Sequence, residues 1–204
     1  MPSKTFHLAQ DKQDSISISW KGVWKQVSIT YNGQEVGSFN NQKELKTGNE
    51  FQLDAERKLS VKLSGQLFPE LELLVNGQAI AGSPTDPNVQ LKQVFNFSLG
   101  IGGLSLVVGL IAELFVIDFL LNIGIGLGSI IYGGLIILLA FGVKRKSIIA
   151  LALIVGLIGL EIVGSVWIAA ESQVNPTSGI VIKTFFLIFL FKGFGAIKKL
   201  KKTE

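Results

Sequence analysis

Apolar and polar positions divide this chain at about Asn96 into two halves with different patterns. Before that residue, apolar and polar residues alternate in short runs, and after it four runs are almost wholly apolar: 97–117, 119–141, 147–170 and 179–197. A helix needs roughly 20 predominantly apolar residues to cross the hydrocarbon core of a bilayer. The pattern therefore predicts a bundle of four transmembrane helices over residues 96–198, followed by a basic tail at 199–204.

The connection between the first two apolar runs is very short, which favours a tight helical hairpin. Only the residues around Glu113 to Asp118 separate the two runs. An alternative is that residues 97–141 form a re-entrant element with one crossing, which would leave three spans and put the termini on opposite faces. Because both segments reach spanning length, we expect four crossings.

The first half shows the alternation of half-buried strands, in which every second residue is apolar. Residues 23–31 alternate in this way, and Asn32-Gly33 then tolerates the positive dihedrals of a type I′ hairpin turn. The return strand is expected at 34–39. Residues 70–75 lead into a second Asn-Gly turn and a return strand at 78–80. The shared NGQ after a strand is a short internal repeat, consistent with two hairpins in one antiparallel domain.

Further alternating segments extend the number of strands to six or seven. They are an early strand at 15–20 and the segments 51–53 and 59–63, which flank a polar DAER turn. That number suffices for a compact sandwich or barrel, and no helix is required. We therefore expect an all-β antiparallel sandwich or barrel over residues 1–82, and a linker at 83–95 that begins with turn-forming GSPTDP.

The residues ahead of the first expected strand are polar and charged. They lack the apolar core of a cleavable secretory signal, so we expect the amino terminus to stay in the compartment where it is made. His7 in this polar arm is interpreted as a solvated side chain. Trp20 and Trp24 are expected to pack in the core or at the rim of the β domain, with stacking on a ligand as the alternative.

Charge distinguishes the two halves as clearly as hydropathy does. The formal net charge is +4, and basic and acidic residues cancel up to Phe95. In the second half seven of the nine basic residues lie in the second predicted loop and the tail: Lys144, Arg145, Lys146, Lys198, Lys199, Lys201 and Lys202. The other two loops carry acidic residues, so the positive-inside rule places both termini in the cytoplasm. The basic tail can also bind anionic lipid.

Glu161 lies near the middle of the third apolar run, where a charge costs at least about 2.5 to 3.5 kcal/mol. Three interpretations are open: a protonated carboxyl with a hydrogen bond, a structural ion pair, or a proton or cation site. Lys183 is the natural partner, because antiparallel third and fourth spans bring the two backbones within roughly 7 Å in depth. The alternative is that Lys183 extends to the outer headgroups.

Small residues form stripes along the first two apolar runs. They recur at helical spacing: Gly102, Ser105 and Gly109 in the first run, and Gly124, Gly126, Gly128 and Gly133 in the second. Such stripes let helix backbones approach closely in lipid, so we expect the first two spans to pack tightly, with a homodimer contact as the alternative. The second set lacks the loop and the Lys-Ser/Thr of a phosphate-binding motif.

The residue types that catalysis requires do not occur in a recognisable arrangement. Cysteine is absent and His7 is the one histidine, which excludes thiolate metal sites and a cysteine nucleophile. No nucleophile with a base and no cofactor motif is found, and the balanced charge of the first half argues against nucleic acid. We therefore expect a non-catalytic protein without a cofactor or metal.

The segments WKGVWKQVSITYNGQEV, TGNEFQL and LELLVNGQAI, in this order, resemble the β-rich domain of the Fas apoptosis inhibitory molecule family. The resemblance covers residues 6–82. It implies protein–protein interaction rather than catalysis, and it transfers no residue-level binding site. The whole chain also resembles uncharacterised bacterial membrane proteins that carry such a domain ahead of four spans.

These observations together predict an accessory or assembly subunit of a membrane protein complex. Its partners would be the lipid bilayer and another membrane protein, with a homo-oligomer as a further option. The alternative is a small transporter or channel subunit in which Glu161 and Lys183 line a polar path.

Overall fold

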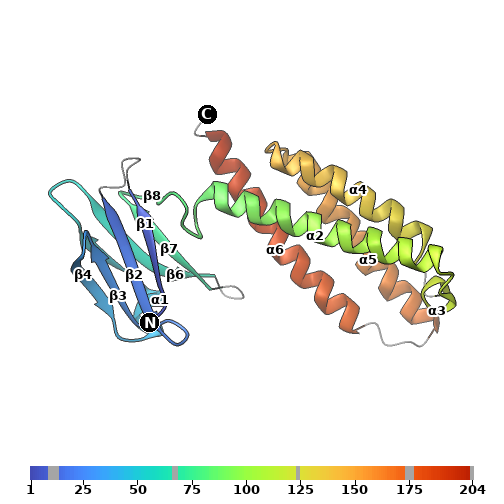
Figure 1. Cartoon of the computed structure of the whole chain (residues 1–204), viewed down its shortest axis with the longest axis horizontal. Coiled ribbons are helices and arrows are strands. Elements are labelled where there is room, and N and C mark those ends of the chain that lie inside the picture. Colours follow the sequence, from blue (N-terminus) through green and yellow to red (C-terminus); the bar gives the residue numbers. More distant parts are fainter. Residues whose placement is uncertain (9–13, 66–68, 123–124, 173–176, 203–204) are drawn as a thin grey trace. The chain divides into compact units, whose positions relative to one another are not determined.

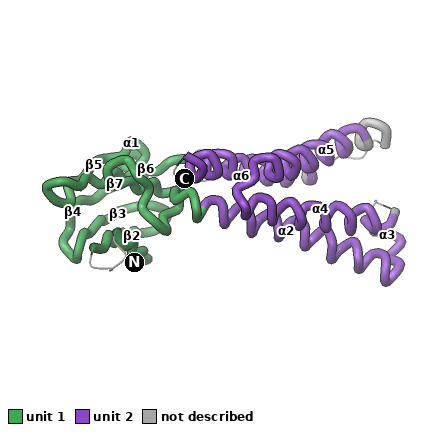
Figure 2. Tube along the Cα trace, turned by 90° about the horizontal axis from the view of Figure 1, so that it is seen from above, with its two compact units in different colours: residues 1–89 green, residues 90–204 purple. Residues whose placement is uncertain are grey.

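The computed structural model describes the chain except for residues 9–13, 66–68, 123–124, 173–176 and 203–204. It consists of two compact units, Met1–Val89 and Gln90–Glu204, which Figure 2 distinguishes by colour. The first unit is an antiparallel β domain, and the second contains helices long and apolar enough to cross a membrane. The predicted fold class, a β domain followed by four such helices, is confirmed.

The strands of the described residues form two antiparallel sheets of four strands each (Figure 1). Each sheet is a meander in which sequential strands pair. The first contains β1 (Ser3–His7), β2 (Ser15–Lys21), β3 (Lys25–Tyr31) and β4 (Gln34–Phe39). The second contains β5 (Asn49–Gln52), β6 (Lys58–Ser64), β7 (Glu70–Val75) and β8 (Gln78–Ala79).

One apolar core joins the two sheets, which makes the first unit a sandwich. Ile18 and Ile29 of the first sheet are fully buried in the same cluster as Leu59 and Leu73 of the second. These residues occupy alternate positions of their strands, so one face of each sheet is apolar. The partly buried rings of Trp20 and Trp24, whose centroids lie 5.0 Å apart, pack against this core.

Both Asn-Gly dipeptides form the predicted hairpin turns. Asn32 and Gly33 have φ of 49° and 83°, and Asn76 and Gly77 have φ of 49° and 81°. Positive φ at both central residues is what a type I′ turn requires, and Asn and Gly tolerate it with little strain. The dipeptides therefore fix the register of β3 with β4 and of β7 with β8.

The two turns also reveal that the short sequence repeat is a structural repeat. Asn32 exchanges hydrogen bonds with the first residue of β2: its side-chain oxygen accepts from the Ser15 N–H at 2.8 Å, and its own N–H donates to the Ser15 carbonyl at 2.9 Å. Asn76 makes the same pair of bonds with Lys58, the first residue of β6, at 2.9 and 3.0 Å. The segments β2 to β4 and β6 to β8 are thus equivalent halves of the sandwich.

An ionic network links the two halves at these equivalent positions. Arg57, which precedes Lys58, donates to Asp14 at 2.8 Å, to the Tyr31 hydroxyl at 2.8 Å and to Asp54 at 2.6 Å. The Tyr31 hydroxyl in turn donates to Asp14 at 2.9 Å. The hydrogen bond from Arg57 holds the pKa of Asp14 at about 2. Because Asp14 precedes β2 and Arg57 precedes β6, the network ties one sheet to the other.

The structure places His7 in a strand and not in a polar arm. It is the last residue of β1 and pairs with Ser15 of β2. Phe6 is the one buried residue of this strand. A single apolar position gives no alternation, which is why the pattern of the sequence did not indicate β1.

The expectation that the β domain needs no helix is wrong, because α1 (Gln42–Thr47) connects the two sheets. The Asn41 side chain accepts a hydrogen bond from the Glu44 N–H at 2.9 Å, and the Glu44 carboxylate accepts one from the Asn40 N–H at 2.9 Å. Such reciprocal capping stabilises a helix start. Leu45 is buried, and Gly48 ends the helix with a φ of 81°.

The second unit contains α2 (Pro87–Leu114), α3 (Asp118–Asn122), α4 (Leu127–Lys144), α5 (Ile148–Ser172) and α6 (Thr177–Lys202). Among the described residues, four of these helices meet the length and hydropathy of a membrane span. The expected linker at 83–95 is shorter in the structure, because α2 begins at Pro87. The Asp86 carboxylate accepts a hydrogen bond from the Asn88 N–H at 2.9 Å, and proline at the first helical position is favourable.

The second span begins later than the apolar pattern predicts. It was expected over 119–141, but α3 occupies the first part of that range and α4 starts at Leu127. The Glu113 carboxylate accepts a hydrogen bond from the Leu127 N–H at 2.6 Å and so caps α4. Hydropathy does not reveal this break, since most residues between 118 and 126 are themselves apolar. The helices α2 and α4 are separate, and each is long and apolar enough to cross a membrane.

Glycines bring the backbones of α2 and α4 into direct contact. A Cβ atom added at Gly102 would lie 2.8 Å from the Gly133 carbonyl oxygen, and one at Gly133 would lie 2.5 Å from the Gly102 carbonyl oxygen. A Cβ at Gly109 would lie 2.9 Å from the Gly126 carbonyl oxygen. These close contacts are between two helices of one chain, so the glycine stripes pack the first two spans against each other. A Cβ at Gly128 would meet nothing within 4 Å.

Ser105 lines a cavity, described below. Gly124 lies outside the described residues.

The ends of the long helices gather the basic residues at one end of the second unit. Phe95 of α2 packs against Phe141 of α4 with ring centroids 5.7 Å apart, and the Lys144 ammonium lies 5.4 Å from the Phe95 centroid. Gly193 near the end of α6 adjoins Val94 of α2. The turn between α4 and α5 and the end of α6 therefore share an end, with the basic residues at 144–146 and 198–202.

The close contact of α2 and α4 predicts a position-specific effect of alanine. Gly133→Ala forces the two backbones apart, and such overpacking typically costs about 1 to 3 kcal/mol. Gly134→Ala is the matched control, because a Cβ there meets nothing within 4 Å. We expect Gly133→Ala alone to lower the thermal unfolding temperature of the detergent-purified chain. Equal unfolding temperatures for the two variants would contradict the contact.

The network of Asp14 predicts a specific sensitivity to acid. Its pKa is lowered from 3.8 to about 2 in the folded state, mainly by the hydrogen bond from Arg57. A carboxyl whose pKa falls on folding stabilises the fold fully above the unfolded pKa and loses this contribution as the pH drops through the folded pKa. Stability of the β unit should therefore fall between about pH 4 and pH 2, and Asp14→Asn should remove that part of the loss.

The measurement is denaturant unfolding followed by tryptophan fluorescence in a Trp167→Phe background, so that Trp20 and Trp24 report on the β unit. The pKa of Asp54 is also lowered in the folded state, so the stability of the Asp14→Asn variant should still fall with decreasing pH, but less steeply. If the free energy of unfolding fell equally with decreasing pH in the wild type and in Asp14→Asn, the network of Asp14 would not stabilise the fold.

Candidate intramembrane polar site

Glu161 continues the buried apolar stripe of α5. Leu151, Ile154 and Ile158 are 0, 0 and 1% exposed and recur at spacings of three and four. The same spacing continues to Glu161 and then to Ser165. Residues at these spacings share one face of a helix, so the carboxyl group is directed toward the other helices of the unit.

Lys183 occupies the equivalent place on α6. Leu190, Gly193 and Ile197 are buried, and the same spacing of three and four extends backward through Phe186 to Lys183. The stripe of α6 packs with that of α5 in one apolar cluster. Each helix therefore replaces an apolar residue of its packing face with a charged one.

The two charged residues meet in the structure. The Lys183 Nζ lies 3.4 Å from Glu161 Oε2 and donates a hydrogen bond to the Ser165 hydroxyl at 3.2 Å. The Ser165 hydroxyl donates to the Glu161 backbone carbonyl at 2.7 Å. The side chains of Lys183 and Glu161 are 28 and 37% exposed, so both are shielded only in part. Lys183 is thus directed to Glu161 rather than to the end of the helix.

Tyr132 of α4 adds a polar group that the sequence analysis missed. Its hydroxyl oxygen is buried and makes no hydrogen bond within the described part of the chain, while it lies close enough to Glu161 to interact electrostatically. A buried hydroxyl without a partner is unfavourable and calls for an explanation. The available signal was composition: Tyr132 is one of two tyrosines and lies inside an apolar run.

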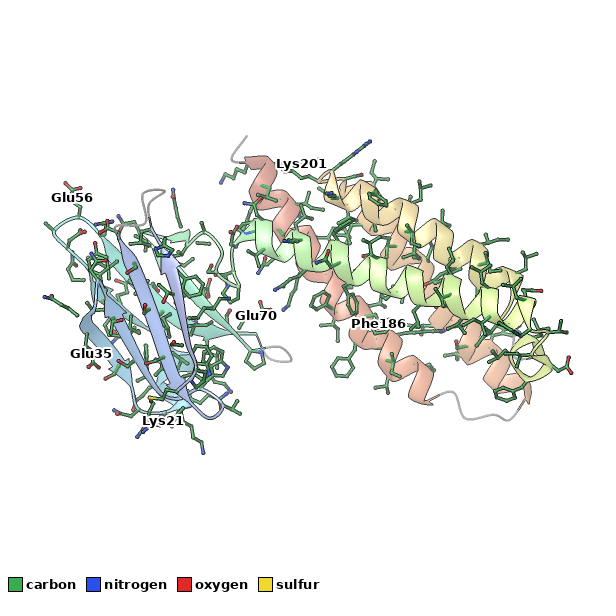
Figure 3. All side chains as sticks on the ribbon, in the orientation of Figure 1. Lys21, Glu35, Glu56, Glu70, Phe186 and Lys201 are labelled. Atoms are coloured by element: carbon green, nitrogen blue, oxygen red, sulfur yellow. The ribbon has the colours of Figure 1, made fainter. Side chains whose placement is uncertain are left out.

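A cavity of about 440 Å³ adjoins this group of residues. All four long helices line it: α2 with Asn96 and Ser105, α4 with Tyr132, α5 with Glu161 and α6 with Lys183. The remaining wall is glycine and apolar side chains, including Phe186, which is labelled in Figure 3. The predicted pair therefore lies at the wall of a chamber inside the helical unit.

The other predicted residues, Ser105 excepted, lie apart from this site. The basic residues at 144–146 and 198–202 are at the end of the unit described above. Among the described residues, no group of three or more His, Cys, Asp or Glu side chains could hold a metal ion. The site offers one carboxylate, one ammonium and hydroxyl groups, which can bind polar groups or relay a proton.

The contact between Glu161 and Lys183 predicts recovery by charge exchange. Glu161→Lys or Lys183→Glu alone leaves two like charges in the membrane unit, and an unpaired charge in the apolar part of a membrane costs at least about 2.5 to 3.5 kcal/mol. The double exchange restores an opposite pair. We expect each single variant to lower the yield of monodisperse protein in size-exclusion chromatography, and the double variant to recover most of it. A double variant no better than the worse single one would exclude a stabilising pair.

Comparison with known proteins gives no relative from which a role for these residues could be transferred. No protein-family model, curated protein or solved structure matches the chain. The resemblance of residues 6–82 to the Fas apoptosis inhibitory molecule family stays a prediction from the sequence. The function of the chain is therefore inferred from the structures of its two units.

Proposed function

We propose that this chain is a non-catalytic integral membrane protein whose β-sandwich binds another protein, as an accessory or assembly subunit of a membrane complex. The helical unit anchors the sandwich to the bilayer. The observation that carries the proposal is a basic groove on the β unit, between the loop at Lys21–Lys25 and the start of α1.

The groove has the features of a surface for an acidic partner. Its volume is about 700 Å³, and Lys21, Lys25 and Lys43 line it, with no acidic side chain among the described residues of its wall. Val23 at its edge is 74% exposed, an apolar residue held in water. Figure 3 labels Lys21 at this part of the unit. An acidic protein segment with an apolar residue would complement both the charge and the exposed valine.

The backbone of this loop and of the start of β3 is held in an unusual conformation. Trp24 and Gln26 have φ of 57° and 48°, which side chains other than glycine and asparagine adopt rarely. Strained backbone persists where the surrounding structure holds it and is concentrated at functional sites. The contact of the Trp24 ring with the Trp20 ring, with centroids 5.0 Å apart, supplies such support next to Val23.

The proposal includes the orientation in which both termini are cytoplasmic. Its support is the gathering of the basic residues at 144–146 and 198–202 at one end of the helical unit, which the positive-inside rule assigns to the cytoplasm. The chain lacks cysteine, so a Glu35→Cys variant carries a single thiol on the β unit. A membrane-impermeant maleimide should label it in permeabilised cells and not in intact ones. Labelling of intact cells would reverse the orientation.

The proposed interaction predicts that charge reversal in the groove releases the partner. Full-length tagged chain is purified in mild detergent, and the co-purifying proteins are identified and quantified. We expect a stoichiometric partner with the wild type and at least about a tenfold loss of it, equivalent to 1.4 kcal/mol, in the Lys21→Glu, Lys25→Glu, Lys43→Glu variant. The matched control reverses three exposed lysines outside the groove: Lys46, Lys58 and Lys62.

A second function is favoured by the contact of the charged pair with the cavity: a small transporter or channel subunit that uses Glu161 and Lys183. In that case the protein would purify alone as a homo-oligomer. Reconstituted vesicles would then show an ion flux that Glu161→Gln abolishes. This pair of results would replace the proposal of an accessory subunit.

A further inference from the structure

The walls of the intramembrane cavity suit an apolar molecule of moderate size. Its volume of about 440 Å³ lies within the range of ligand pockets, roughly 300 to 1,000 Å³. Phe97 and Ile101 of α2, Ile158 of α5 and Phe186 of α6 contribute to an apolar wall. Leu104, which also lines the cavity, is 68% exposed. The cavity therefore opens on the surface that faces lipid in a membrane-spanning helix.

One end of the cavity offers both hydrogen-bond donors and acceptors. The Tyr132 hydroxyl is buried and lies beside Glu161, without a well-formed hydrogen bond to the described residues. Lys183 carries three protons on its ammonium, and its described contacts are with Glu161 and Ser165. Glu161 contacts Lys183 through Oε2, and its second oxygen is a further acceptor. A single polar group of a ligand can thus both accept and donate here.

The charges at this end decide which polar group fits. Glu161 and Lys183 neutralise each other, so a carboxylate, phosphate or ammonium group would add an uncompensated charge within the apolar part of the membrane. A hydroxyl or carbonyl group adds none. It can accept from Tyr132 or Lys183, and a hydroxyl can also donate to Glu161.

We propose that this cavity binds a neutral amphiphile, a molecule with an apolar body and one hydroxyl or carbonyl group, which enters from the bilayer. The apolar body lies between α2 and α6, and the polar group reaches Tyr132 and the charged pair. This binding site is separate from the proposed protein-binding groove of the β unit, and the proposal does not depend on that groove.

Photolabelling of the full-length chain in vesicles tests the site. Three probes share one aliphatic chain with a diazirine and differ in the terminal group, which is a hydroxyl, a carboxylate or an amine. We expect the alcohol to label peptides of α2 and α6 that line the cavity, about tenfold more than the two charged probes, equivalent to 1.4 kcal/mol. Peptide mapping by mass spectrometry locates the label.

Two variants on one helix provide the matched control. Gly100 lines the cavity and Gly103 does not, and a Cβ at either would meet nothing within 4 Å. Gly100→Leu should fill the cavity and abolish labelling by the alcohol, whereas Gly103→Leu should leave it unchanged. Tyr132→Phe removes the hydroxyl alone and should lower the labelling several-fold.

Three results would overturn the proposal. The first is equal or stronger labelling by a charged probe, which would refute the selection of a neutral group. The second is labelling that persists in Gly100→Leu, which would place the probe on the outer lipid-facing surface. The third is unchanged labelling of Tyr132→Phe, a variant that also decides the question if Gly100→Leu does not fold.

Discussion

Helices in a bilayer cannot be held together by burying apolar side chains, because lipid tails are as apolar as the side chains themselves. The second unit meets this constraint in two ways. The α2 and α4 backbones approach closely at Gly102 and Gly133, which gains van der Waals contact along the glycine stripe. The α5 and α6 helices combine apolar packing with the polar contact of Glu161 and Lys183. The cavity lies where these two helix pairs face each other.

The first unit solves the opposite problem, since in water the hydrophobic effect alone brings its two sheets together. Its specificity comes from polar groups at the edges of the core. Asn32 and Asn76 tie each hairpin turn to the start of a neighbouring strand, and Arg57 ties one sheet to the other. In both units, polar contacts that contribute little to the free energy of folding thus select one way of packing the sheets or helices together.

Local patterns in the sequence were sufficient for most of the architecture. Alternation indicated the central strands, the Asn-Gly dipeptides fixed two turns, and apolar length identified four spans. Strand β1 was not predicted because Phe6 is its one buried residue, and α1 was not predicted because a six-residue helix with one buried residue, Leu45, shows no helical periodicity. The break before Leu127 depends on Glu113, fourteen residues earlier, and composition does not show such a contact.

Only those parts of the candidate site that depend on single residues were predictable from the sequence. An ionisable residue in an apolar run is conspicuous, and antiparallel spans of known length bring Glu161 and Lys183 to similar depth. The cavity and the unpartnered hydroxyl of Tyr132 depend on how four helices fit together, which no single run of residues specifies. The groove on the β unit likewise joins a loop and a helix start that lie about twenty residues apart in the sequence.

The equivalence of the two halves of the sandwich gives the Asp14–Arg57 contact a further consequence. The two residues occupy matching positions, each directly before the strand that its asparagine holds. Two copies of the first half would bring two carboxylates together, and two copies of the second half two guanidinium groups. Neither pairing of like halves could form the ion pair between Asp14 and Arg57, so this link between the two sheets requires one half of each kind.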